Sequence, residues 1–322
     1  PSTGNPGLNQ LSAADFFSGS GATGIVNPLY YFDDVVYKTA DAKKAAAPAS
    51  NGEFARGTAA PSIMRAPAGT SMPSKPVISK GSLGYAFDIY PGMTFFSFDT
   101  DDPATQNVIS TIDYSPFGGS FDAVNTDFMY TIDYDNNQLK KVEVATGATT
   151  IIGSCMPYGS ESWTGIAVDK NTNIMYGMST DISESHIYTI DMATGAATVI
   201  GATGIPGAID VAIDGTGQMY TFDLVNDEAY KVDKATGAST LLGSIGYDAN
   251  YAQGMGWDPA SDIVYLAAYN NATGSGELRI LDRVTGNTTL VGGMGGEIDG
   301  LAFPGGGGGN WASIEPASGT VP

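Results

Sequence analysis

The stretch VEVATGATTIIG (142–153) recurs with small changes as IDMATGAATVIG (190–201), VDKATGASTLLG (232–243) and LDRVTGNTTLVG (281–292). In each copy, apolar and polar residues alternate on both sides of a Thr-Gly pair. Alternation with a period of two is typical of a half-buried strand, and Thr-Gly is typical of a turn. Each copy therefore predicts a β-hairpin whose turn glycine has a positive φ.

A second phrase precedes each of these hairpins. It reads FDAVNTDFMYTID (121–133), GIAVDKNTNIMYGM (165–178), DVAIDGTGQMYTFD (210–223) and GMGWDPASDIVYLA (254–267), which again predicts strand, polar turn and strand. Aligning Val124, Val168, Ile213 and Trp257 gives spacings of 44, 45 and 44 residues. A unit of four antiparallel strands with this period is typical of a β-propeller blade.

The two ends of the array are incomplete in complementary ways. EIDGLAF (297–303) matches only the first strand of the unit, whereas GYAFDIY (84–90), MTFFSFD (93–99) and NVISTI (107–112) match the other three, with DDPAT in place of the hairpin turn. Together they complete one blade. The sequence therefore predicts an all-β fold, a five-bladed propeller closed by a C-terminal inner strand.

Composition divides the chain into three parts. Residues 1–80 are rich in Ala, Gly, Ser and Pro and predict an extended arm, residues 81–304 hold the propeller, and residues 305–322 form a glycine hinge followed by a tail strand. The chain has 14 Lys and Arg against 34 Asp and Glu, a net charge of -20, which disfavours nucleic acid as a partner. No apolar run predicts a membrane span, and the single Cys155 is expected to be buried.

The blades, with Tyr-x-Ile-Asp and Ala-Thr-Gly-x-x-Thr-x-Ile-Gly, resemble the repetitive β-propellers of extracellular bacterial and archaeal proteins. The tail WASIEPASGTV (311–321) resembles the opening strand of bacterial immunoglobulin-like modules. These resemblances imply an extracellular or cell-surface location and a non-catalytic module.

Few residues suggest catalysis. His186 is the only histidine and is expected to be an exposed hairpin residue, so the sequence disfavours histidine-based nucleophilic catalysis and His/Cys metal sites. Asp122, Asp210 and Asp299 come from the inner strands of three blades and could face the axis. Because paired carboxylates hydrolyse glycosidic bonds, a five-bladed glycoside hydrolase is one alternative function.

Two kinds of loop suggest ligands or modification. The turn DKNTN supplies Asp169, Asn171 and Asn173 as candidate calcium ligands, although Asx turns, in which the side chain bonds its own backbone, are the favoured interpretation. Asn271 and Asn287 lie in N-x-T sequons at predicted hairpin loops and are candidate glycosylation sites. No other cofactor is expected.

The arm contains one dense run of strand-forming residues between Leu29 and Tyr37 that has no place in a closed five-blade ring. We expect it to add to another sheet, together with the tail, and to build a homopolymer such as a fibre or surface layer. Adhesion to another surface protein or to glycans is the alternative. The candidate interaction residues are Leu29, Tyr30, Tyr31, Phe32, Val35, Val36, Tyr37, Trp311 and Ile314.

Overall fold

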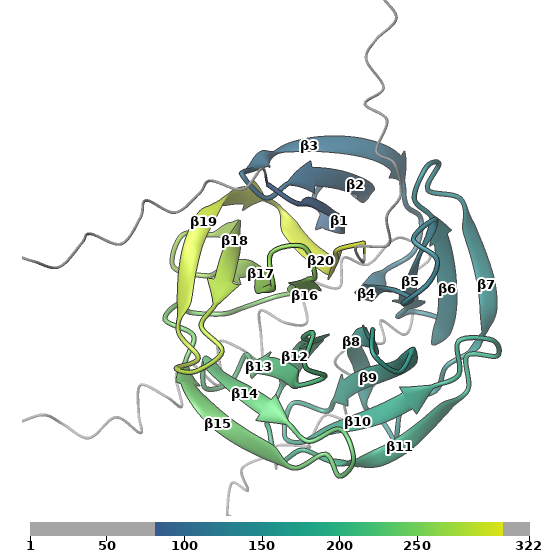
Figure 1. Cartoon of the computed structure of the whole chain (residues 1–322), viewed down its shortest axis with the longest axis vertical. Coiled ribbons are helices and arrows are strands. Elements are labelled where there is room, and N and C mark those ends of the chain that lie inside the picture. Colours follow the sequence, from purple (N-terminus) through teal and green to yellow (C-terminus); the bar gives the residue numbers. More distant parts are fainter. Residues whose placement is uncertain (1–80, 305–322) are drawn as a thin grey trace, which may run out of the picture.

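A computed structural model describes residues 81–304, which form five antiparallel sheets of four strands arranged as blades around a central axis (Figure 1). The fold is therefore the five-bladed β-propeller that the repeats predict. The arm and tail, with all nine candidate interaction residues, lie outside the described residues. No helix within residues 81–304 is long and apolar enough to cross a membrane.

Each blade runs from an inner strand near the axis to an outer strand at the rim (Figure 1). Blade 1 contains β20 (Glu297–Ala302), β1 (Leu83–Tyr90), β2 (Thr94–Asp99) and β3 (Asp102–Thr111). Blade 2 contains β4 (Pro116–Phe121), β5 (Phe128–Asp133), β6 (Gln138–Glu143) and β7 (Thr149–Ser154). Blade 3 contains β8 (Ser162–Asp169), β9 (Ile174–Thr180), β10 (Ser185–Ile190) and β11 (Ala197–Ala202). Blade 4 contains β12 (Ala208–Ile213), β13 (Met219–Asp223), β14 (Glu228–Val232) and β15 (Ser239–Ser244), and blade 5 contains β16 (Gly254–Asp258), β17 (Ile263–Asn270), β18 (Ser275–Leu281) and β19 (Thr288–Gly295).

Blade 1 closes the ring with strands from the two ends of the propeller. Its inner strand β20 pairs antiparallel with β1, and Ala302 lies opposite Tyr85. Phe303, which follows β20, is buried against the rings of Phe98 and Tyr265, with ring centroids 6.5 and 5.2 Å apart respectively. The predicted closure by residues 297–303 is confirmed.

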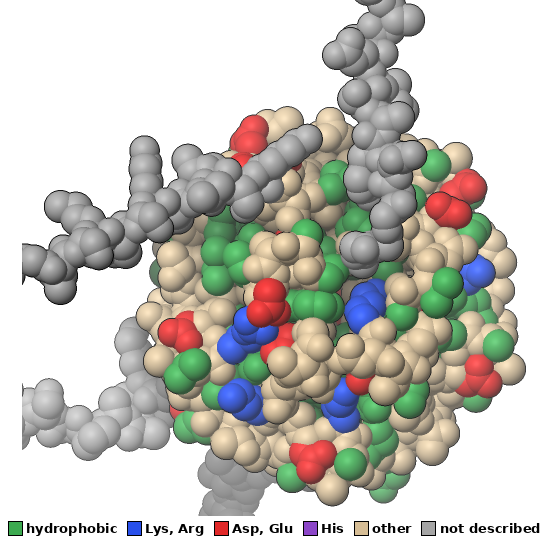
Figure 2. All heavy atoms as spheres, in the orientation of Figure 1, with side chains coloured by type: hydrophobic (Ala, Val, Ile, Leu, Met, Phe, Trp, Pro, Cys, Tyr) green, Lys and Arg blue, Asp and Glu red, His purple; other side chains and the backbone are tan. Residues whose placement is uncertain are grey.

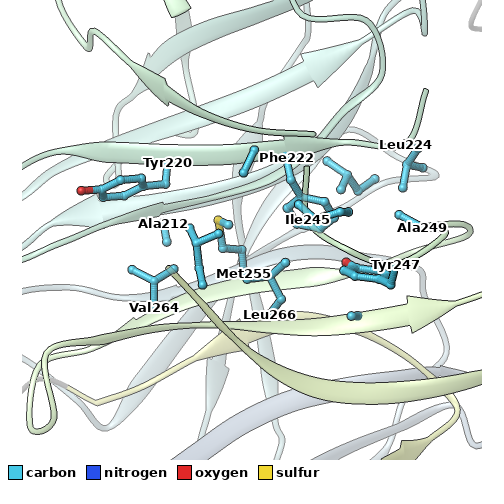
Figure 3. Close-up of a cluster of buried hydrophobic side chains, with 14 residues drawn as sticks. Ala212, Tyr220, Phe222, Leu224, Ile245, Tyr247, Ala249, Met255, Val264 and Leu266 are labelled. Carbon is cyan, nitrogen blue, oxygen red and sulfur yellow. The ribbon is translucent and has the colours of Figure 1, made fainter. Parts of the chain in front are cut away.

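The apolar core lies between the blades. Figure 3 shows one such cluster, in which Tyr220 and Phe222 of blade 4 pack with Met255 and Leu266 of blade 5. Each of the other four junctions between neighbouring blades has its own cluster of this kind. Because every blade buries its apolar faces only against its neighbours, the ring is expected to be stable as a unit. Charged side chains are scattered over the face shown in Figure 2 and do not form one broad patch.

The repeated Thr-Gly turn and the glycine that ends the repeat meet across neighbouring blades. The Thr-Gly turn of blade 3 lies against Gly153 of blade 2, and a Cβ on Gly153 would be 2.0 Å from the carbonyl oxygen of Thr194. A Cβ on Gly243 of blade 4 would be 2.4 Å from the carbonyl oxygen of Thr285 in blade 5. The turn glycines Gly147, Gly195, Gly237 and Gly286 all have positive φ, as predicted.

Two details of the sequence alignment are corrected. Val124 lies in the turn after β4 and is 86% exposed, whereas Phe121 pairs with Met129 as Val168 pairs with Met175, so Phe121 is the equivalent residue of blade 2. The hairpin between β2 and β3 turns at residues 100–101, because Asp102 already belongs to β3. The stretch DDPAT is therefore mostly strand.

Candidate functional site

The five inner strands pack backbone against backbone around the axis. A Cβ on Gly119 of β4 would be 2.1 Å from the carbonyl oxygen of Gly300 in β20, and one on Gly256 of β16 would be 2.6 Å from that of Leu301. Between the strands lies a cavity of about 20 Å³, lined by residues from all five inner strands. That volume is enough for roughly one water molecule, not for a sugar.

Asp299 is fully buried and links β20 to β4. Its Oδ1 accepts hydrogen bonds from the backbone N–H groups of Gly118, at 2.9 Å, and Gly300, at 2.5 Å. Its Oδ2 is buried without a hydrogen-bond partner among the described residues. Burial raises the pKa of Asp299 to about 8, which the two N–H donors oppose.

Asp210 is also fully buried and links three inner strands. Its Oδ2 accepts a hydrogen bond from the N–H of Met255 in β16 at 2.6 Å, and the N–H of Ile166 in β8 also bonds its carboxylate. Its Oδ1 accepts one from Val211 at 2.7 Å, and its φ of 44° reaches the left-handed region. Burial, and then the negative charge of Asp299, raise its pKa well above the ordinary value.

Asp122 does not join these two residues, which corrects the expectation that all three face the axis. It lies beyond the end of β4, where its Oδ1 accepts hydrogen bonds from the N–H groups of Val124, at 2.7 Å, and Asn125. Its carbonyl oxygen accepts a bond from Lys170 Nζ at 3.0 Å. Neither Asp210 nor Asp299 lines the axial cavity, so their carboxylates serve the backbone and are not presented to a ligand there.

Lys170 is the cationic group beside the axial cavity. Its Nζ donates to the carbonyl oxygens of Phe121 and Asp122, which ties blade 3 to blade 2. Burial lowers the pKa of Lys170 to about 8, whereas the nearby charge of Asp122 raises it. Its ammonium group thus satisfies the carbonyls at the end of β4.

A buried polar cluster in blade 3 was not found from the sequence. Glu161 Oε1 lies 2.5 Å from His186 Nδ1, while its Oε2 accepts hydrogen bonds from Ser179 Oγ and from Tyr188 OH, the latter at 3.3 Å. His186 is half-buried in β10 beside the ring of Tyr158, which corrects the expectation of an exposed hairpin residue. Ser179 is fully buried, so its hydroxyl is not placed to attack a substrate.

The candidate calcium turn has a protein partner for each side chain. Asp169 Oδ1 accepts from the N–H of Asn171 at 2.9 Å, and its Oδ2 forms an ion pair with Lys234 at 2.5 Å. Asn173 Oδ1 instead accepts from the N–H of Ala123 in blade 2. The favoured Asx turn is confirmed, and equivalent turns form at Asp214 and Asp258. Residues 81–304 contain no group of three or more His, Cys, Asp or Glu side chains able to hold a metal ion.

The remaining predicted residues are Cys155 and the asparagines of the two sequons. Cys155 is buried as a free thiol, as expected, and its carbonyl oxygen accepts a hydrogen bond from Trp163 Nε1 at 2.7 Å. Asn271 is exposed in the loop between β17 and β18 and Asn287 in the loop between β18 and β19, so both sequons stay candidate glycosylation sites.

A wider depression lies between blades 3 and 4. It has a volume of about 610 Å³ and is lined by side chains that include Tyr176, Lys231, Asp233 and Lys234. Lys234 Nζ lies 5.4 Å from the centroid of the Tyr176 ring and is already paired with Asp169. An aromatic ring and polar groups around an open depression can hold a sugar.

A scan against protein families finds no match for this sequence, and a search of curated proteins finds none either. Solved structures that are similar include a Bacteroides thetaiotaomicron protein of unknown function, with 18% identity, a TM-score of 0.40 and 56% of this chain covered. The chain spans 44% of that protein. A chain of a nidogen/laminin complex has 14% identity and a TM-score of 0.46, with 68% of this chain and 97% of that chain covered. The aldose sugar dehydrogenase of Streptomyces coelicolor, in its PQQ-bound form, has 17% identity and a TM-score of 0.43, with 61% and 74% covered.

Proposed function

We propose that this protein is a non-enzymatic, extracellular structural subunit that self-assembles into a fibre or surface layer by strand addition through its N-terminal arm and C-terminal tail. The observation that carries the proposal is the rim of the propeller. Each blade ends in an outer strand with one edge unpaired by any described strand. Such edges are sites for the addition of a further strand, and proteins that do not use them usually protect them with charge or proline.

The carboxyl groups and the small cavity near the propeller axis support the non-enzymatic part of the proposal. A glycoside hydrolase needs two carboxyl groups that face a cleft large enough for a sugar ring. Here Asp210 and Asp299 bond backbone N–H groups of neighbouring blades, and the adjacent cavity holds about one water molecule. These carboxyl groups therefore act as links between inner strands.

Glycan binding is the second candidate function, and the depression between blades 3 and 4 favours it. Tyr176 offers an aromatic ring there and Lys231 an ammonium group, and small-molecule sites combine aromatic walls with a few polar groups. On this alternative the propeller is an adhesion module of a larger surface protein.

Assembly of the full chain tests the proposal. Light scattering and electron microscopy at increasing concentration should show polymers for residues 1–322 and monomers for a chain that lacks residues 1–80. Polymers that form equally well without the arm, or a full-length chain that stays monomeric at high concentration, contradict it. Binding to a glycan array that is lost in Tyr176→Ala would favour the adhesion module instead.

A further inference from the structure

The outer strands of the five blades share one exposed aliphatic residue at the same register position. Each of these residues lies immediately before the bulged residue of its outer strand. In blades 1 to 5 they are Val108, Ile151, Val199, Leu241 and Leu290. A scattered exposed aliphatic residue is ordinary, but the same slot filled in every blade places one at the middle of each open edge.

Four of these edges lack the charged residues and prolines that protect many edge strands. The strands β7, β11, β15 and β19 read TTIIGS, ATVIGA, STLLGS and TTLVGGMG, without a charged residue or a proline. Only β3 has such residues, Asp102 and Pro103. In a chain of net charge -20, the absence of charge from four consecutive edges favours pairing with another strand.

Among the four, only β7 begins with an exposed residue. Thr149, Thr150 and Ile151 are three consecutive exposed residues at its start, and Ile151 is 57% exposed. The first residues of β15 and β19 are instead held by hydrogen bonds. Ser239 Oγ donates to the carbonyl oxygen of Thr203, and Thr288 Oγ1 donates to that of Ile245.

A cation lies beside this edge. Lys141 of β6 lies opposite Thr150, contacts the ring of Phe128 and forms no ion pair with a described residue. The equivalent positions are Thr189 in blade 3 and Ile280 in blade 5, whereas blade 4 also has a lysine there, Lys231. The β7 edge therefore combines exposed aliphatic surface with a positive charge, and a strand that is apolar with an acidic centre complements it.

A sequence with this pattern occurs outside the described residues. Residues 29–37 read LYYFDDVVY, apolar on both sides of Asp33 and Asp34. The 43 residues between Tyr37 and Gly81 span up to about 140 Å when extended, so this segment can reach the rim of a second molecule.

We propose that the outer edge of β7 is the acceptor for the Leu29–Tyr37 strand of a second copy of this chain, an assignment that rests on the self-assembly proposed above. The added strand pairs with the free backbone groups of β7, covers Ile151 on one face of the sheet and places one of its two consecutive carboxylates near Lys141 on the other face. Because donor and acceptor are different surfaces, each copy offers one of each, and the contact propagates head to tail.

Two substitutions in the full-length chain separate donor from acceptor. Ile151→Lys puts a charge on the edge, and Val35→Pro removes a backbone N–H from the donor strand. Each should remain monomeric at ten times the concentration at which the unaltered chain polymerises. An equimolar mixture should give a 1:1 heterodimer by size-exclusion chromatography with light scattering, because the arm of the first variant still fits the edge of the second. The matched control Leu241→Lys changes the equivalent residue of β15, which also has a lysine beside it, Lys231 opposite Thr240, and should polymerise normally.

The outcomes distinguish the two proposals. Normal polymers of Ile151→Lys, or equal loss of assembly in Leu241→Lys, overturn the assignment to β7 and leave self-assembly through the arm in place if Val35→Pro is monomeric. A monomeric unaltered chain overturns both proposals. Thermal unfolding of each variant should match that of the unaltered chain, because the changed propeller side chains are exposed. If Ile151→Lys does not fold, Ile151→Thr replaces it. Threonine keeps the β-branched shape, so this variant should weaken assembly without abolishing it.

Discussion

Gly201, the last residue but one of the outer strand β11, lies so close to Thr236 in blade 4 that a Cβ on Gly201 would be 2.3 Å from the Thr236 carbonyl oxygen. The same contact joins blade 2 to blade 3 and blade 4 to blade 5. Between blades 5 and 1, Pro103 replaces the Thr-Gly turn and lies against Gly292. The Thr-Gly turn of one blade and the glycine near the end of the preceding outer strand thus form the junction between neighbouring blades.

Gly201→Ala should therefore destabilise the propeller. The added methyl group has no room unless the Thr236 turn moves, and an overpacked site of this kind costs about 1–3 kcal/mol of unfolding free energy. Gly293→Ala is the matched control, because a Cβ on Gly293 meets no atom within 4 Å. Denaturant unfolding of both variants measures the difference, and equal midpoints would show that the rim contact is not tight.

The sequence was sufficient to predict the five-bladed ring but not the side-chain contacts inside it. Alternation, the Thr-Gly turns and the two complementary ends predict the blade, the number of blades and the closing strand, because these depend on local patterns repeated along the chain. Turn lengths differ between blades, so the spacing rule placed Val124 where Phe121 belongs. The direction of Asp122, and the meeting of Glu161 with His186, depend on contacts between distant segments that no local pattern encodes.

Stability should fall as the pH rises, because of Asp299. Its pKa is about 8 in the folded protein and 3.8 ordinarily, so the folded state holds a proton that the unfolded state releases. The stabilisation by this proton is complete below about pH 4 and is lost as the pH rises through about 8. The raised pKa values of Asp210 and Asp223 act in the same direction.

Asp299→Asn tests this assignment. The amide oxygen can still accept from Gly118 and Gly300, but the side chain no longer titrates. Between pH 5 and pH 8, roughly, the melting temperature of the variant should decline less than that of the unaltered chain. Parallel curves would mean that Asp299 does not titrate in this range.

A chain that ends at Met294 should lose the cooperative unfolding of the whole ring. It lacks β20, so β1 loses its partner strand and the cluster around Leu301 and Phe303 disappears. A chain that ends at Pro304 is the matched control, because it removes only the residues after the propeller. Calorimetry should show a much lower or broader transition for the first truncation and an unchanged one for the second. Identical melting of both would be incompatible with closure by β20.

Assembly should increase with salt. Each copy carries a net charge of -20, and acidic side chains are distributed over the face in Figure 2, so two copies repel each other as they approach. At about 0.01 M salt this repulsion extends roughly 30 Å, whereas at about 0.15 M it extends roughly 8 Å. Screening therefore lowers the barrier to contact at the rim, where β7, β11, β15 and β19 carry no charge of their own. Light scattering across this range should show polymerisation at lower protein concentration as salt rises. A comparison of calcium with a chelator at fixed ionic strength separates general screening from binding of a specific ion, and equal assembly in both would leave screening as the cause. Assembly that weakens with salt would contradict the prediction. It would mean that charge pairs such as the one proposed at Lys141 outweigh the repulsion between whole copies.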